Sequence, residues 1–186
     1  MKKAMIAVAL LGTMGLVGTA SAFQASQVFP WSGTVPAMPT SETWVIAQPT
    51  GAPITNGILT FKTDAAGNKG VLTGSTELRF NVFKESTATP NTPDIAQPAV
   101  SYGYKLVSLA VNTSGLAVEQ AADSYFAIQG SNGGVAAPLV KNALIPGVSG
   151  ETVLSVVKGT GVSNQPNAGD SVDVQATIVV EGASLL

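Results

Sequence analysis

Alternation of apolar and polar residues is clearest in the last part of the chain, from Asp170 to Gly182. Its apolar positions share one face: Val172, Val174, Ala176, Ile178 and Val180. A period of two is typical of a strand with one buried face. The sequence ends at Leu186 with no later strand. We therefore expect this strand to lack an in-chain partner, and to leave backbone groups and an apolar slit uncovered.

Other segments have the same period, or are short apolar runs between Gly, Pro and Asn residues. They predict strands at 42–47, 57–62, 75–85, 100–111, 122–129 and 151–158. No long segment sustains a helical period. With the C-terminal strand the number is close to the seven strands, roughly, of an immunoglobulin-like sandwich. The sequence thus predicts an all-β fold, an incomplete immunoglobulin-like sandwich, over residues 36–186.

Aromatic residues in two predicted strands raise questions of function. In 75–85, Leu78, Phe80 and Val82 are expected to face inward, whereas Phe83 falls on the outer face and is a candidate contact between subunits. Tyr102 and Tyr104 share one face of the longest strand candidate. For this pair we favour core packing over a sugar-binding platform.

The segments between strands are rich in Gly, Pro, Asn and Asp. The sequence TDAAGNKG at 63–70 lacks the ligand number and spacing of a calcium loop and predicts a hairpin turn. Three prolines in 86–98 predict a long polar loop, a candidate outward-facing surface. Pro138 and Pro146 predict an irregular or edge segment at 135–148.

The N-terminal 22 residues have the features of a secretory signal peptide. Two lysines precede an apolar stretch, and Ala20-Ser21-Ala22 is a small-residue cleavage site. The alternative is an uncleaved anchor, but the stretch is short for a membrane span. A type IV pilin leader is rejected because polar residues and Pro30 follow the site instead of a long apolar helix. We expect export and no membrane span after cleavage.

The next stretch, residues 23–35 (FQASQVFPWSGTV), predicts an extended N-terminal arm that runs into the first strand of the domain. One face at period two carries the residues we assign to a donor strand: Phe23, Ala25, Gln27 and Phe29. Pro30 cannot donate to a ladder and is expected to end the pairing, so that Trp31 begins the domain's own first strand. Two alternatives stay open: the arm folds back on its own domain, or it remains disordered.

Composition excludes several classes of function. The chain has no Cys and no His, which removes most nucleophile–base pairs and the usual zinc and copper sites. A carboxylate pair stays formally possible, but eleven scattered acidic residues favour solvated charges, so we expect no enzyme, no metal and no cofactor. Cleavage removes two of nine basic residues and leaves a net charge of −4, which argues against nucleic acid as a partner.

Several features together resemble the major pilins of the chaperone–usher class. They are the signal ending ASA, the arm with its Trp31-Ser32 pair, the absence of cysteine, and the final NAGDSVDVQATIVVEG. More narrowly, the chain is similar to the alternate branch, which includes the enterobacterial common pilus and the colonisation-factor fimbriae. Many pilins of the main branch have a disulfide, and this chain has none, which favours the alternate branch.

The resemblance implies a function and a set of partners. The chain would be a pilus subunit, exported through the periplasm to the cell surface and polymerised by donor-strand exchange, supporting adhesion or biofilm formation. A periplasmic chaperone would lend a strand beside 170–182, and at an outer-membrane usher the arm of the next copy would replace it. The alternative is a self-complemented secreted or pilus-tip adhesin that binds a host or surface ligand.

Overall fold

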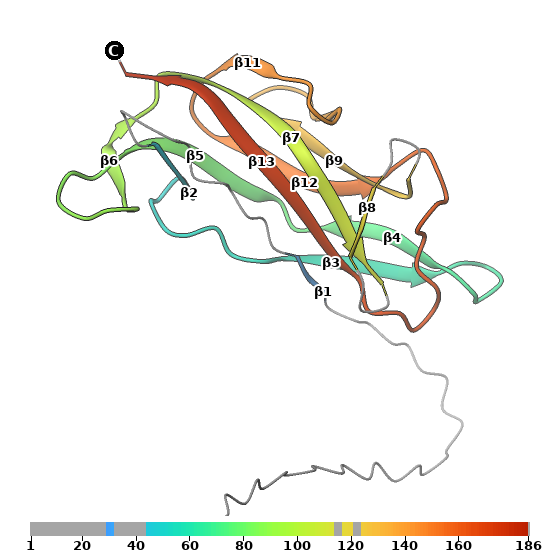
Figure 1. Cartoon of the computed structure of the whole chain (residues 1–186). Coiled ribbons are helices and arrows are strands. Elements are labelled where there is room, and N and C mark those ends of the chain that lie inside the picture. Colours follow the sequence, from blue (N-terminus) through green and yellow to red (C-terminus); the bar gives the residue numbers. More distant parts are fainter. Residues whose placement is uncertain (1–28, 32–43, 114–116, 121–123, 186) are drawn as a thin grey trace, which may run out of the picture.

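The computed structural model describes residues 29–31, 44–113, 117–120 and 124–185, and in these ranges all regular structure is β-strand (Figure 1). The strands are β1 (Phe29–Trp31), β2 (Trp44–Ala47), β3 (Gly57–Thr63), β4 (Gly70–Ser75), β5 (Leu78–Glu85), β6 (Pro93–Pro98), β7 (Ser101–Asn112), β8 (Ala117–Glu119), β9 (Phe126–Ser131), β10 (Ala137–Pro138), β11 (Ile145–Val148), β12 (Thr152–Lys158) and β13 (Asp173–Ser184). No helix in the described ranges is long and apolar enough to cross a membrane.

The strands form three antiparallel sheets. One has the order β1-β3-β4, a second β10-β9-β12-β5-β2 with β6 also on β5, and a third β11-β7-β13 with β8 also on β7. The first two sheets meet where the Ser75 hydroxyl at the end of β4 donates to Val156 O and accepts from Val156 N of β12. Since β4 and β5 are separated by only two residues, the first two sheets continue one another as a single layer.

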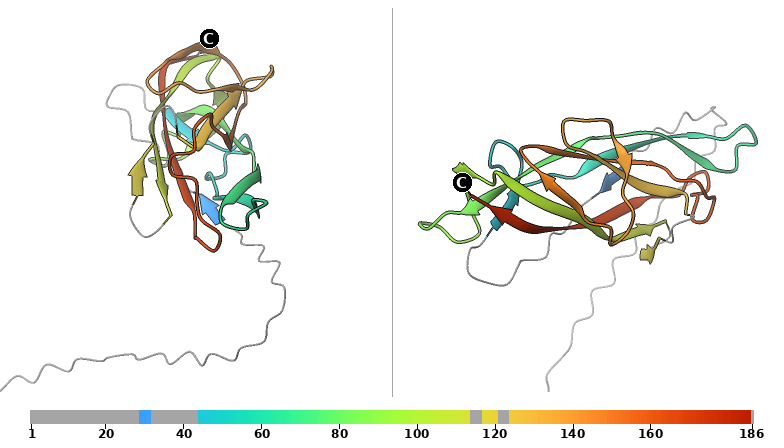
Figure 2. Two further views of the ribbon diagram at one scale, coloured as in Figure 1. Left: turned by 90° about the vertical axis from the view of Figure 1, so that its right-hand side faces the viewer. Right: turned by 90° about the horizontal axis from the view of Figure 1, so that it is seen from above.

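The β7–β13 sheet packs across this layer. In Figure 1 the two strands run side by side in front of β5, β9 and β12, and the left view of Figure 2 places them on one side with β3 and β4 on the other. The buried core draws residues from both layers: the ring centroids of Phe80 in β5 and Tyr104 in β7 lie 6.1 Å apart, edge to face. This arrangement is consistent with a β-sandwich.

The structure confirms the predicted strands at 57–62, 100–111, 151–158 and 170–182 to within a few residues. Residues 44–47 of the first prediction form β2, and 42–43 lie outside the described residues. Two predictions need correction in their bounds. The strand predicted at 75–85 is divided into β4 and β5, and the one predicted at 122–129 begins at Phe126 and extends to Ser131.

The predicted polar loop at 86–98 is wrong over its second half, which forms β6 on the edge of β5. Proline led to the error, because Pro93 and Pro98 exclude a central strand but not an edge strand. In contrast, the predicted edge character of 135–148 is confirmed by β10 and β11. The hairpin turn at 63–70 is also confirmed, since it joins the antiparallel strands β3 and β4.

Phe83 is not an exposed contact between subunits, as the sequence suggested. The residue is 2% exposed, and its ladder partners are Val45 in β2 and Pro98 in β6. The strand β6, absent from the sequence prediction, flanks β5 at this residue. Tyr102 and Tyr104 are buried, as predicted for core residues, and therefore cannot form a sugar-binding platform.

Candidate functional site

The C-terminal strand β13 forms one edge of its sheet. It pairs with β7 along almost its whole length, from Asp173 opposite Asn112 to Ser184 opposite Ser101. The prediction that this strand lacks an in-chain partner is therefore wrong for one edge. At the other edge, no strand of the described ranges pairs with β13. We call this second edge the free edge of β13.

The predicted inner face of β13 is confirmed. Val172, directly before β13, and Val174, Ala176, Ile178 and Val180 within it are 1%, 0%, 8%, 5% and 4% exposed. All five belong to the main core cluster. Between them, Gln175 is exposed and Thr177 half-buried. As the period of the sequence predicted, the apolar face of the strand lies in the core and the polar face points outward. The free edge lies between these two faces and presents the backbone N–H and C=O groups.

The opposite edge of β7 is occupied by two short strands. The strand β11 pairs with it at Tyr102 and Tyr104, and β8 pairs with it from Ala110 to Asn112. The backbone of β7 is therefore flanked on both sides, and β13 is the outermost long strand of the sheet.

Across from the free edge lies the sheet of β1 and β3. The strand β1 pairs with β3 and also lies beside β13, as the left view of Figure 2 shows. Near its start, therefore, β13 approaches the β1–β3 edge of the other layer.

Of the predicted donor residues, the structure describes Phe29 alone; Phe23, Ala25 and Gln27 lie outside the described residues. Phe29 pairs with Leu59 of its own chain, and Pro30 pairs with Ile58. In-chain pairing thus includes Phe29, two residues before the expected start at Trp31. Proline is tolerated there because β1 is the outer strand of its sheet.

Edge strands in the described ranges differ in how they are protected. Proline occurs in the short outer strands β1, β6, β10 and β11, at Pro30, Pro93, Pro98, Pro138 and Pro146. Three other outer strands have no proline but are short: β2, β4 and β8 have four, six and three residues. By comparison, β13 has twelve residues and no proline. Long unprotected edges invite pairing with another chain, and proteins block them with proline, charge or short length.

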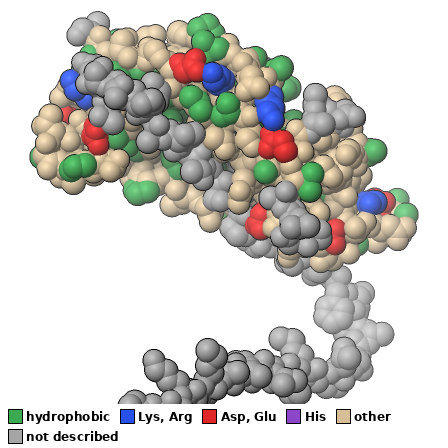
Figure 3. Space-filling model, in the orientation of Figure 1, with side chains coloured by type: hydrophobic (Ala, Val, Ile, Leu, Met, Phe, Trp, Pro, Cys, Tyr) green, Lys and Arg blue, Asp and Glu red, His purple; other side chains and the backbone are tan. Residues whose placement is uncertain are grey.

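The surface around the site is weakly charged. Charged residues make up 11% of the chain, below the usual quarter, and on the face shown in Figure 3 they are few and scattered. On β13 itself, Glu181 forms an ion pair with Lys105 of β7. Charge therefore does little to repel a neutral strand from this edge.

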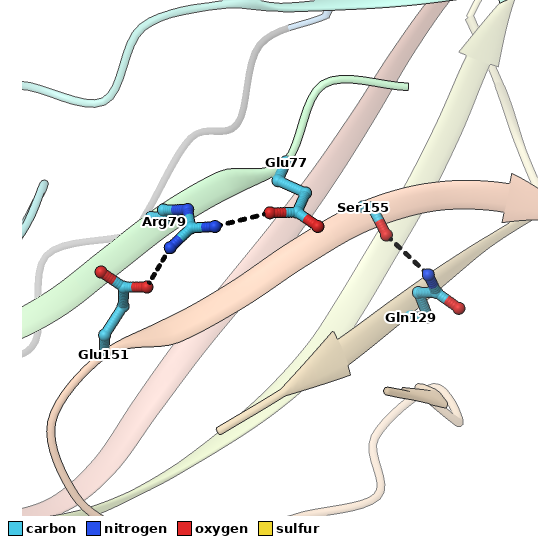
Figure 4. A network of polar contacts seen from close by, with 5 residues as sticks. All are labelled: Glu77, Arg79, Gln129, Glu151 and Ser155. Atoms are coloured by element: carbon cyan, nitrogen blue, oxygen red, sulfur yellow. Dashed lines mark hydrogen bonds and ion pairs between the residues drawn. The ribbon is translucent and has the colours of Figure 1, made fainter. Parts of the chain in front are cut away.

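The outer face of the other layer carries ordinary polar contacts (Figure 4). Arg79 donates to Glu77 and Glu151, both at 2.7 Å, and Gln129 Nε2 donates to Ser155 Oγ at 2.9 Å. These bonds tie β5 to the start of β12, and β9 to β12. Their side chains already satisfy one another, which accords with a solvated outer face.

Buried polar groups support the core rather than chemistry. The Tyr102 hydroxyl donates to Gly150 O at 2.8 Å and lies 2.6 Å from Thr152 Oγ1. Burial raises its pKa to about 12, and it raises the pKa of Tyr104 as well. In the described part of the chain, no three His, Cys, Asp or Glu side chains cluster so as to hold a metal ion.

Sequence reasoning missed a contact between two turns beside β13. The turn between β3 and β4 meets the turn at 165–170, and Lys69 bridges to Asn167. The sequence signals were Asp64 and Asp170, each placed to hold a turn through its carboxylate. That the two turns meet depends on the fold and has no local signature.

Comparison with known proteins gives no family: no family model, no curated protein and no solved structure matches this chain.

Proposed function

We propose that this protein is a structural subunit of a surface pilus that polymerises by donor-strand exchange. In this proposal, the free edge of β13 accepts an extended arm from another copy. Such head-to-tail contacts do not close on themselves and therefore build a filament. The sandwich would be an incomplete immunoglobulin-like domain that the incoming strand completes.

The observation that carries the proposal is the free edge of β13. It is long, it has no proline, and its inner face lies in the core at the boundary between the layers. Addition of a strand would satisfy its backbone groups and extend the sheet. Every proline-bearing edge of the described fold is less suited to such pairing.

The arm supplies a donor of matching character. Residues 23–28 precede β1 and carry Phe23 and Ala25 at period two. Burying Phe23 alone would contribute roughly 1.5–3 kcal/mol. Phe29 can join the donor strand only if β1 leaves β3, because Phe29 pairs with Leu59 in the free chain. The donor segment proposed here is therefore centred on 23–28, with Phe29 added when β1 detaches.

The signal-like N-terminus and the resemblance to alternate-branch pilins supply the cellular part of the proposal. The subunit would reach the cell surface through the periplasm, with a chaperone covering β13 until an outer-membrane usher presents the next arm. Adhesion or biofilm formation would be the role of the assembled filament.

A second candidate function is a self-complemented secreted or tip adhesin. The pairing of β1 with β3 in the same chain favours it, because an arm that continued this ladder would remain with its own domain. Such a protein would be a stable monomer. The two functions therefore differ in oligomeric state.

Deletion of residues 23–28 tests the first function and leaves β1 intact. The deleted chain, co-expressed with its chaperone, should give no ladder of polymers on an unboiled gel, whereas the unaltered chain should give one. Gln24→Ser, in the opposite register of the arm, is the matched control and should polymerise. Polymers of the deleted chain would show that the arm is not the donor, and an unaltered chain that is a stable monomer without a chaperone would support the adhesin.

A further inference from the structure

The turn between β3 and β4 is held by a carboxylate. Asp64 Oδ1 accepts hydrogen bonds from Asn68 N at 2.8 Å and Lys69 N at 3.1 Å. These bonds, first that from Lys69, hold the pKa of Asp64 below its ordinary value of 3.8. The turn thus has a defined shape, and residues 68–70 present backbone groups and the Lys69 side chain to residues 165–168.

A second turn, at 167–170, is built in a similar way. Asp170 Oδ2 accepts from Asn167 N at 2.8 Å and from Asn167 Nδ2 at 3.1 Å, and Asp170 N donates to Asn167 O. Gly169 has φ +90°, a conformation that favours glycine at the third position of a tight turn. Asn167 Nδ2 donates within its own turn, whereas Asn167 Oδ1 accepts a hydrogen bond from Lys69 of the other turn.

Four hydrogen bonds join the two turns, and we call this contact the clasp, formed by residues 68–70 and 165–168. Gly70 N donates to Pro166 O and Ala168 N donates to Asn68 O, at 2.8 and 3.0 Å. Gln165 Nε2 donates to Gly70 O at 2.9 Å. Lys69 Nζ donates to Asn167 Oδ1 at 2.8 Å.

Close packing accompanies these bonds. A Cβ atom added at Gly70 would lie 3.1 Å from Pro166 Cγ, nearer than most such contacts. Pro166 is itself buried, although it lies in a surface turn. The clasp is therefore a fitted contact in which backbone, side chains and shape all take part.

The clasp lies at one end of the proposed acceptor site. On one side it forms the turn of the β3–β4 hairpin, whose strand β3 pairs with β1 at its other end, from Gly57 to Leu59. On the other side it leads through residues 169–172 into β13. The strand β1 in turn lies beside β13. The clasp thus joins the β3–β4 hairpin, at the end of β3 remote from β1, to the segment that leads into β13.

We propose that the clasp sets the register of the strand that adds to the free edge of β13. By tying the β3–β4 turn to the segment before β13, it closes this end of the site and gives an incoming strand a fixed stop. Register otherwise rests on side-chain pattern alone, which a two-residue shift preserves in part. This inference rests on the proposed function, because it concerns the strand added to the same edge.

Photo-cross-linking between copies of the chain tests whether the clasp sets the register of the added strand. The full mature chain carries p-benzoyl-phenylalanine in place of Phe23, and nitrogen-15-labelled and unlabelled copies are mixed so that mass spectrometry separates cross-links between chains from those within one. The clasp is weakened by Lys69→Met, and further by Lys69→Met with Gln165→Leu. Lys62→Met removes an exposed lysine of β3 that takes no part in the clasp and is the matched control.

In the unaltered chain and in Lys62→Met, the intermolecular cross-link should fall on one site at the edge of β13. The weakened clasp should raise the share of shifted cross-links roughly two- to tenfold, the effect of one lost hydrogen bond on an equilibrium. Hydrogen exchange at the amides of Gly70 and Ala168 measures the opening of the clasp, and thermal melting measures overall folding. A single unshifted site in the double variant overturns the inference. If the unaltered chain forms no cross-link from one copy to β13 of another, the proposed function fails and this inference with it.

Discussion

The sheet of β11, β7 and β13 has two edges that are built differently. The edge strand β11 has four residues with Pro146 and Gly147 at its centre, and its register with β7 shifts between Ile145 and Val148. At the other edge, β13 has twelve residues and pairs with β7 over ten positions. One edge strand is short, and the other is three times as long, although its register with β7 also shifts, between Thr177 and Ile178 and between Glu181 and Ser184.

The loop after β11 is also fastened to the domain. Asn132 Nδ2 donates to Ser149 O and Glu151 O, both at 2.8 Å, and the Tyr102 hydroxyl donates to Gly150 O. Comparable side-chain ties on the free edge of β13 are absent among the bonds of the described residues. Within the described residues, therefore, one edge of the sheet is short and fastened and the other carries no further strand, as we expect of a protein that adds a strand on one side only.

Substitution by proline in β13 should have the largest effect on folding or assembly. Neighbouring residues of an edge strand direct their backbone N–H groups to opposite sides, so Gln175→Pro and Ala176→Pro remove bonds to different edges. One variant should lose a bond to β7 and much of its folding stability. The other should stay folded but form no polymers on an unboiled gel.

Pro146→Ala is the reciprocal variant, because it restores an N–H group to β11. We expect its polymers to equal those of the unaltered chain, since the edge stays short and the ties to Gly150 and Ser149 remain. If both proline variants of β13 are folded and still polymerise, the free edge is not the site of assembly.

Removal of a core side chain from β13 should have the next largest effect. Ile178 is 5% exposed, and Ile178→Ala should lower the free energy of unfolding by about 2–4 kcal/mol, from lost burial and the cavity left behind. Thr177→Ala, on the opposite face, should change it by less than about 0.5 kcal/mol. Denaturant unfolding measures both, and equal losses would contradict the assignment of the two faces.

At the protected edge, Tyr102→Phe should lower the free energy of unfolding by about 1–2 kcal/mol, because Gly150 O and Thr152 Oγ1 lose a buried partner. Burial raises the pKa of Tyr102 from 10 to about 12. This group therefore adds stability below pH 10 that is lost as the pH rises toward 12. Denaturant melts at pH 9 and pH 11 should show a smaller alkaline loss in the variant than in the unaltered chain. A loss of the same size in both would contradict a role for this hydroxyl.

The smallest effect should come from Asp64, which holds the turn between β3 and β4 beside the clasp. Its pKa lies below 3.8 because backbone N–H groups, first that of Lys69, stabilise the carboxylate. The bonds should therefore be complete above pH 3.8 and be lost as the pH falls through the lower folded pKa. Hydrogen exchange of the Asn68 and Lys69 amides, corrected for its intrinsic pH dependence, should speed up in that acidic range, and Asp64→Ala should show the fast exchange at every pH. Protection that persists in Asp64→Ala would contradict this account of the turn.

Local pattern was enough to predict some parts of the fold and not others. The five inner residues of β13 were predicted because alternation is a property of consecutive residues. Its pairing with β7 was missed because strand partners are distant in sequence. Phe83 was predicted to be exposed. The strand β6 that flanks it was not predicted, because Pro93 and Pro98 indicated a loop. The boundary of the arm was set at Pro30 by the same rule about proline, although an outer strand such as β1 can include it.

The most direct test of the central claim is a disulfide between two different copies. The chain has no cysteine, so each copy can carry a single new one: Ser26→Cys in the arm of one, and Gln175→Cys or Thr177→Cys on β13 of the other. Ala143→Cys, just before β11, is the control at the protected edge. After mild oxidation of the mixture, we predict a disulfide-linked pair of chains with a β13 cysteine and none with the control. Equal yields at both edges, or no linked pair at β13, would contradict the claim that the free edge of β13 receives the arm of another copy.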